Sequence, residues 1–161
     1  MLQRIRKKEF SNCVENGVAR FKVFPGGTTE RINYYLVPEL RENRYKKVVI
    51  HCGTNDLYDK SGEEIVRGME EIYETCMSHG VETIIFSGIV YRRGRQDVEE
   101  KRLFVNSILE CRCRSEWLHN TKFVVNSNIL DTDLYKDGLH LIESGTIKLA
   151  NNILNCININ N

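Results

Sequence analysis

Apolar residues in this chain gather in short runs of the kind that form strands. Residues 47–52 and 81–90 are strongly apolar and rich in β-branched side chains, and 122–126 is a shorter run of the same type. Such runs are typical of strands buried on both faces of a parallel sheet. Residues 18–24 instead alternate apolar and polar positions and stop at Pro25-Gly26-Gly27, which predicts a strand closed by a turn.

Between these runs, apolar residues recur every three or four positions, which predicts helices. Helices are expected at 2–12, 97–117 and 144–157. Another is expected to begin at Thr28 or Thr29 and to run to about Leu36, with Pro38 disturbing its later turns. A fifth is expected to follow the capping box Ser61-Gly-Glu-Glu64 and to end at Gly80. The side chains expected to face inward are Ile65, Met69, Ile72 and Cys76, then Val98, Val105, Ile108 and Leu109, then Ile147, Ala150, Ile153, Leu154 and Ile157.

The alternation of strands and helices indicates the fold class. Strands joined by helices of this length form right-handed βαβ crossovers, which give a parallel sheet with helices on both faces. The fold class is therefore α/β. A length of 161 residues fits one domain, 1–161, and the sequence contains no repeat, low-complexity tract or linker that indicates a second.

Composition excludes several classes of protein. With 41% apolar and 28% charged residues the chain is typical of a globular protein, and its formal charge of +1 gives no global attraction to nucleic acid or anionic membranes, so neither is an expected partner. The basic clusters at 4–8 and 92–95 are interpreted as solvated faces. No run is long enough to span a membrane and no signal peptide is evident, which predicts a cytoplasmic location.

The six cysteines lack the spacing of a zinc site and are interpreted as reduced thiols. No zinc site is therefore expected. Substrate-contacting loops are expected at 58–61 and 91–96, and the sequence gives no oligomeric state.

Two polar motifs follow predicted strands, where open α/β sheets carry their chemistry. The first is Gly53-Thr-Asn55-Asp56. Asn55 can offer an amide donor to a charge developing in a cleft, or it can simply cap its own turn.

The second motif is Asp137-Gly-Leu-His140, ahead of the last predicted helix. An aspartate three residues before a histidine can orient the imidazole as a general base, which is two-thirds of a serine-hydrolase triad. An aspartate that caps a helix and a histidine that binds a backbone carbonyl would have the same spacing, so both interpretations stay open.

Taken together, Pro25-Gly26-Gly27-Thr28-Thr29, Gly53-Thr-Asn55-Asp56 and Asp137-Gly-Leu-His140 resemble, in order and placement, three of the four motif blocks of the SGNH hydrolases, also called the GDSL family. The resemblance extends from residue 18 to about 157. The two segments His-Cys-Gly-Thr-Asn-Asp-Leu and Asp-Gly-Leu-His-Leu are most similar to the SGNH esterase-type domains carried by animal LINE-type retrotransposons.

This resemblance implies a flavodoxin-like three-layer α/β/α sandwich that hydrolyses small ester or lipid substrates without metal or cofactor. It implies that Gly26 gives a backbone N–H and Asn55 a side-chain amide to the oxyanion hole. It further implies that His140 is the catalytic base and Asp137 its orienting partner.

The family's first block, an apolar strand ending Gly-Asp-Ser that carries the nucleophile, does not occur in this sequence. We therefore expect a fold that lacks its first strand, a chain that starts just after that motif, and no esterase activity as written. Substitute nucleophiles are not expected: Ser87 belongs to another strand, Cys52 has nothing nearby to lower its pKa, and Thr28 or Thr29 is expected to cap a helix.

Two other function classes remain as alternatives. The chain can be a non-catalytic retroelement-derived remnant or an interaction domain that keeps the fold. Nucleotide binding through Asn55-Asp56 is less favoured, because the sequence contains no glycine-rich phosphate loop.

Overall fold

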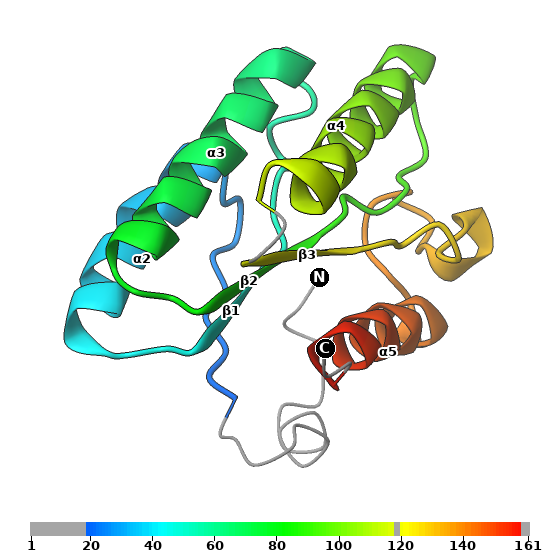
Figure 1. Cartoon of the computed structure of the whole chain (residues 1–161). Coiled ribbons are helices and arrows are strands. Elements are labelled where there is room, and N and C mark those ends of the chain that lie inside the picture. Colours follow the sequence, from blue (N-terminus) through cyan, green and yellow to red (C-terminus); the bar gives the residue numbers. More distant parts are fainter. Residues whose placement is uncertain (1–18, 118–119, 159–161) are drawn as a thin grey trace.

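The computed structural model describes residues 19–117 and 120–158 (Figure 1). The elements follow in the order α2 (Thr29–Glu42), β1 (Lys47–Ile50), α3 (Gly62–Ser78), β2 (Thr83–Ser87), α4 (Gln96–Ser115), β3 (Thr121–Val124), the 3-10 turn η2 (Asp131–Asp133) and α5 (Glu143–Asn158). The helix predicted at 2–12 lies outside the described residues.

The described strands form one parallel sheet of order β1-β2-β3, in which Val48 pairs with Ile84 and Phe86 pairs with Phe123. Helices α2, α3 and α4 cover one face of this sheet and α5 covers the other (Figure 1). The predicted α/β class is confirmed: the fold is a three-layer α/β/α arrangement built on a parallel sheet.

The sheet has a hydrophobic core on each face. Along β2, Ile84 and Phe86 pack with side chains of α3 and α4, whereas Ile85 packs with α5. All three side chains are at most 1% exposed. This two-sided burial is what the continuous apolar run predicted.

Local capping signals fix where two helices begin. Ser61 accepts the N–H of Glu64, and the Glu64 carboxylate accepts the N–H of Ser61, so the predicted capping box is confirmed. Thr28 caps α2 through the N–H of Arg31. Helix α2 then continues past Pro38 to Glu42, further than predicted. Proline leaves unpaired the carbonyl four residues earlier, that of Tyr34, and this residue is 74% exposed, so water can bind it.

The predicted inward face of α5 needs one correction. Ile153 and Ile157 are buried as expected, but Ile147 is 52% exposed and Leu149 is fully buried. The buried stripe on α5 includes Thr146, Leu149, Ile153 and Ile157, spaced three or four apart. Ile147 lies one residue, or about 100°, outside that stripe.

The strand predicted at 18–24 is also corrected, since residues 19–24 join no ladder of the described sheet. An extended segment becomes a strand only when its N–H and C=O groups pair with a neighbour. The apolar side chains of this segment are nevertheless partly buried, because Ala19 and Phe21 pack against the core beneath α5. Lys22 points the other way and pairs with Glu39 of α2 at 2.7 Å.

Candidate active site

The turn that carries Asp137 and His140 is held together by its own hydrogen bonds. One carboxylate oxygen of Asp137 accepts the backbone N–H groups of Leu139 and His140, each at 2.9 Å. The other oxygen lies 2.7 Å from Nδ1 of His140. Gly138 makes the turn possible, because its φ of +67° is one that side-chain-bearing residues rarely adopt. The carboxylate therefore orients the imidazole with Nε2 on the opposite side.

The same contacts determine the charge of Asp137. Hydrogen bonds from the N–H of His140 and the N–H of Leu139, followed by the imidazole itself, hold the pKa of Asp137 well below its usual range. Asp137 is therefore ionised at neutral pH. Of the two interpretations open for this motif, helix capping does not fit, because the carboxylate binds within its own turn and α5 starts only at Glu143.

The loop after β2 fixes the position of this turn. The N–H of Arg93 donates to the carbonyl of Gly138 at 2.8 Å, and its guanidinium binds Asp131 with two hydrogen bonds of 2.7 and 2.8 Å. On the far side, Leu134 and Leu141 form an antiparallel bridge. The Asp137–His140 turn is therefore bonded to the loop after β2 through Arg93, and the bridge closes the turn at its base.

The second component is the turn ahead of α2. The N–H of Gly27 donates to the carbonyl of Phe24 at 2.9 Å, and Gly26 has φ +67°. A Cβ on Gly26 would meet nothing within 4 Å, so its backbone conformation, and not crowding, requires glycine.

Asn55 follows Gly53, which has φ +96°, and its amide nitrogen donates to the carbonyl of Gly27 at 2.9 Å. An amide nitrogen carries two hydrogens, so this contact leaves a second N–H for another acceptor. The bond joins the loop after β1 to the loop ahead of α2.

A buried carboxylate strengthens that junction. Asp56 is 1% exposed and accepts the backbone N–H of Thr29 at 3.1 Å and its hydroxyl at 3.0 Å. Lys60 lies 3.1 Å from Asp56 and 2.9 Å from Glu30. The two loops that carry Gly26 and Asn55 are therefore connected by a satisfied polar cluster.

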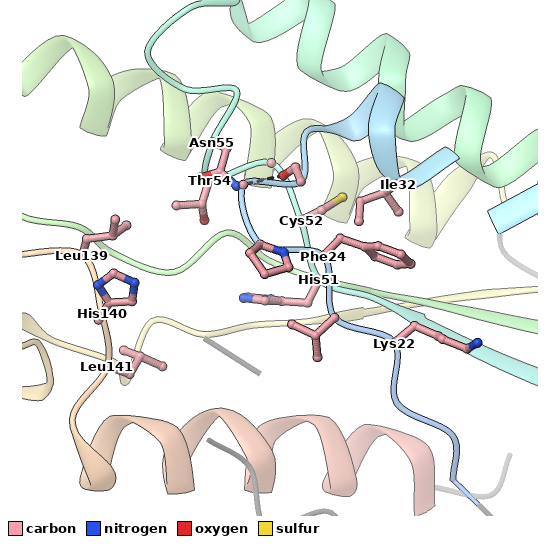
Figure 2. A pocket seen from close by; sticks show the side chains of 15 residues that line it. Lys22, Phe24, Ile32, His51, Cys52, Thr54, Asn55, Leu139, His140 and Leu141 are labelled. Atoms are coloured by element: carbon pink, nitrogen blue, oxygen red, sulfur yellow. Dashed lines mark hydrogen bonds between the residues drawn. The ribbon is translucent and has the colours of Figure 1, made fainter. Parts of the chain in front are cut away.

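These loops enclose a cavity of about 330 Å³ (Figure 2). Gly26, Asn55 and His140 all line it, and Asp137 lies behind His140. The remaining lining residues are Lys22, Val23, Phe24, Pro25, Gly27, Ile32, His51, Cys52, Gly53, Thr54, Leu139 and Leu141. Three of the four predicted site residues thus share one pocket, and the fourth contacts it through the histidine.

Sequence reasoning missed His51, which also lines the pocket. Its Nδ1 lies 3.0 Å from the hydroxyl of Ser87. Burial lowers the pKa of His51 to about 4, so the ring is neutral at pH 7. A polar residue at the end of an apolar strand, directly before the Asn55 motif, was the available signal.

The hydroxyl and thiol groups in or near the pocket do not form an activated nucleophile among the described residues. Ser87 is 5% exposed and lies within the core. Burial raises the pKa of the Cys52 thiol, which contacts the sulfur of Met69. Thr28 caps α2, and no base within the described ranges binds the hydroxyl of Thr54.

Within residues 19–117 and 120–158, no group of three or more His, Cys, Asp or Glu side chains is placed to hold a metal ion. None of the helices described there is both long and apolar enough to cross a membrane.

Comparison with solved structures shows the fold. A protein described as a platelet activating factor from Streptococcus pneumonia matches 97% of this chain and 79% of its own, at 18% identity and a TM-score of 0.78. Two further matches are Axe2, an acetyl-xylooligosaccharide esterase from Geobacillus (84% and 69%, 16% identity, TM-score 0.69), and a GDSL-like lipase from Bacteroides thetaiotaomicron (82% and 71%, 19% identity, TM-score 0.63). No protein-family model matches the sequence, and no curated protein matches it either.

Proposed function

We propose that this chain is an SGNH-type ester hydrolase domain, with His140 as general base, Asp137 as its orienting partner, and Gly26 and Asn55 as oxyanion donors. The observation that carries the proposal is the convergence of an oriented, carboxylate-bound imidazole and two potential N–H donors on one pocket. Each oxyanion donor in such a site contributes about 3–4 kcal/mol of transition-state stabilisation. The structures of similar fold include an acetyl-xylooligosaccharide esterase and a GDSL-like lipase, which supports small ester or lipid substrates for this chain.

The nucleophile is the missing component. We propose that it is a serine at the end of an apolar strand reading Gly-Asp-Ser, which the printed sequence does not contain. On this proposal residues 1–161 form a single domain that lacks one strand and does not turn over esters by itself.

The position of the pocket supports this proposal. One wall comes from residues 22–27 and the other from 51–55, so the pocket follows the free side of β1 in the described sheet. Val48 and Val49 of β1 are only half-buried, whereas their partners Ile84 and Ile85 on β2 are fully buried. A strand added along β1 would cover both valines. Because parallel strands end at the same edge, its last residue would reach the side where His140 lies.

The second candidate is a non-catalytic domain that keeps the fold, in line with the retrotransposon resemblance. The absence of Gly-Asp-Ser from the sequence is the observation that favours it. Under either candidate we propose a cytoplasmic protein that uses no cofactor.

A short-chain p-nitrophenyl ester assay tests the proposal. The 161-residue chain should give no turnover above its His140→Ala variant, because losing one triad member removes most of the catalysis. A fusion that places an apolar strand ending Gly-Asp-Ser ahead of residue 1 should hydrolyse the ester. If the added strand raises the melting temperature of the fusion but the fusion does not hydrolyse the ester, the non-catalytic candidate is favoured.

A further inference from the structure

Arg92, in the loop after β2, contacts the loop that carries Asn55 on both sides of that residue. Its Nη1 donates to the carbonyl of Thr54 at 2.9 Å, and Thr54 directly precedes Asn55. Its guanidinium carbon lies 4.4 Å from the ring centroid of Tyr58, which follows Asn55 in the same loop. The electron-rich face of an aromatic ring attracts a guanidinium, so stacking on Tyr58 orients the group that binds Thr54.

The contacts of Arg92 differ from those of the other arginines in its loop. Arg93 pairs with Asp131 at 2.7 Å and Arg95 pairs with Asp97 at 2.7 Å. Arg92 is instead held by a backbone carbonyl and an aromatic ring, and among the described residues its Nε is buried without an acceptor. A buried N–H without an acceptor costs stability, so stability alone is a poor account of Arg92.

The next residue along the chain binds the turn that carries His140. The N–H of Arg93 donates to the carbonyl of Gly138 at 2.8 Å, two residues before His140. The approach is close, because a Cβ on Gly138 would lie 2.6 Å from the Cβ of Arg93. Figure 2 shows that Asn55 and His140 reach the pocket on separate segments. Residues 92 and 93 therefore connect the segment of the oxyanion donor with the segment of the base.

Helix α4 fixes the start of this connection. Asn106 accepts the N–H of Ile89 at 2.8 Å and donates to the carbonyl of Ile89 at 2.9 Å. Arg102 donates to the same carbonyl at 3.0 Å. Ile89 lies three residues before Arg92, so the connecting loop leaves the sheet from a point that both side chains of α4 hold.

We propose that Arg92 is a positioning residue of the candidate site, which sets the place of the Asn55 amide relative to His140 by holding the carbonyl of Thr54. This inference rests on the proposed function. An oxyanion donor acts only when it lies about 2.7–3.1 Å from the oxygen that becomes charged. The base acts on the same reaction from another segment, so the two segments need a fixed separation. A displacement of about 1 Å can cost about 10²-fold in rate.

The first arm of the test measures ester turnover in the Gly-Asp-Ser fusion. Arg92→Met should lower kcat by about 10–100-fold with KM within about twofold, because Asn55 acts on the transition state more than on the bound ester. Arg92→Lys keeps a donor for Thr54 and should recover part of the loss. Arg95→Met is the matched control in the same loop, since Arg95 pairs with Asp97, and its kcat should be unchanged.

A double variant separates positioning from a general structural role. If Arg92 acts through Asn55, Arg92→Met should cost at most about twofold when Asn55→Ala is already present. A structural role would lower turnover to the same extent in both backgrounds. Losses that multiply independently therefore overturn the proposal.

The second arm needs no turnover and follows amide hydrogen exchange in the 161-residue chain. The N–H of Asp56, bonded to the carbonyl of Gly53 at 3.1 Å, reports on the Asn55 loop. In Arg92→Met this amide should exchange about tenfold faster or more, because the loop loses a hydrogen bond from a charged group. In Arg95→Met its rate should match that of the unsubstituted chain.

The Asn55 loop keeps its other supports in these variants, since Lys101 donates to the carbonyls of Leu57 and Lys60 at 2.7 and 2.5 Å. Where Arg92→Met does not fold, the exposed Tyr58 provides the second pair of variants. Tyr58→Leu removes the ring that orients Arg92 and should lower kcat, whereas Tyr58→Phe keeps the ring and should not. Equal kcat in Tyr58→Leu and Tyr58→Phe then overturns the proposal.

The two proposals fail separately. A fusion that hydrolyses nothing, with faster exchange at Asp56 in Arg92→Met, removes the hydrolase and leaves Arg92 as the residue that holds the Asn55 loop. Ester turnover with unchanged kcat in folded Arg92→Met removes Arg92 alone. An unchanged exchange rate at Asp56 in folded Arg92→Met also overturns the assignment of Arg92.

Discussion

Removing the carboxylate of Asp56 should destabilise the fold strongly, because that group joins the two loops of the candidate site. Its oxygens accept the N–H and the hydroxyl of Thr29, which is fully buried, and form an ion pair with Lys60 at 3.1 Å. In Asp56→Ala both donors of Thr29 lose their acceptor in a place that water does not reach. Lys60 keeps its second partner, Glu30.

The expected magnitude follows from these contacts. Each buried donor left without an acceptor costs about 1–3 kcal/mol, so two cost about 2–6 kcal/mol. Breaking a buried ion pair by removing one partner costs about 3–5 kcal/mol, which overlaps that range. We therefore expect a loss of about 3–5 kcal/mol in the free energy of unfolding, a large share of a typical domain's 5–15 kcal/mol.

Urea denaturation of Asp56→Ala, Asp56→Asn and Asp59→Ala measures this loss. Asn keeps one oxygen acceptor and should fall between Ala and the unsubstituted chain. Asp59 is exposed, and its replacement should change the free energy of unfolding by less than about 0.5 kcal/mol. A loss below about 1 kcal/mol in Asp56→Ala would refute the assignment of Asp56 as the connection between the loops.

Three further predictions address the site and its support. In the Gly-Asp-Ser fusion, Asn55→Ala should lower ester turnover about 10²–10³-fold while leaving the fold intact, and unchanged kinetics would return Asn55 to a turn role. Gly68→Ala places a Cβ 2.4 Å from the hydroxyl oxygen of Thr29, so it should cost about 1–3 kcal/mol in urea denaturation. The N–H and imidazole of His140 depress the pKa of Asp137, so the stability added by this carboxylate is present above the ordinary aspartate pKa of about 3.9 and is lost as pH falls through the lower folded value. Asp137→Asn should therefore lose less stability than the unsubstituted chain as the pH falls from about 5 to about 2, and an identical pH dependence would contradict the assignment.

Local signals in the sequence were sufficient for most elements. The capping box of Ser61 and Glu64 depends on two residues that are three apart in the sequence. The continuous apolar run at β2 was enough to predict that this strand is buried on both faces. The prediction that Ile147 of α5 faces inward was wrong, because Leu149 is equally apolar and only packing against the sheet decides which of the two side chains is buried.

Features that depend on distant partners could not be read from the sequence. The alternation at 18–24 is that of a strand, but strand formation needs a neighbour, and residues 19–24 join none of the described ladders. His51 looked like part of an apolar strand, since its partner Ser87 lies 36 residues away along the chain. The Asp137–His140 contact was predictable because both residues share one short turn.

In the proposed site, His140 acts on a serine that an added strand supplies. The most direct measurement compares ester turnover by four fusions, ending Gly-Asp-Ser or Gly-Asp-Ala, each with and without His140→Ala. Residues that act as a unit are strongly non-additive, so we predict that either change alone abolishes turnover as fully as both together. The Gly-Asp-Ala fusion should melt like the Gly-Asp-Ser fusion, because the two differ by a single hydroxyl. Turnover that survives His140→Ala, or losses that add independently, would show that His140 and the serine do not act as a unit.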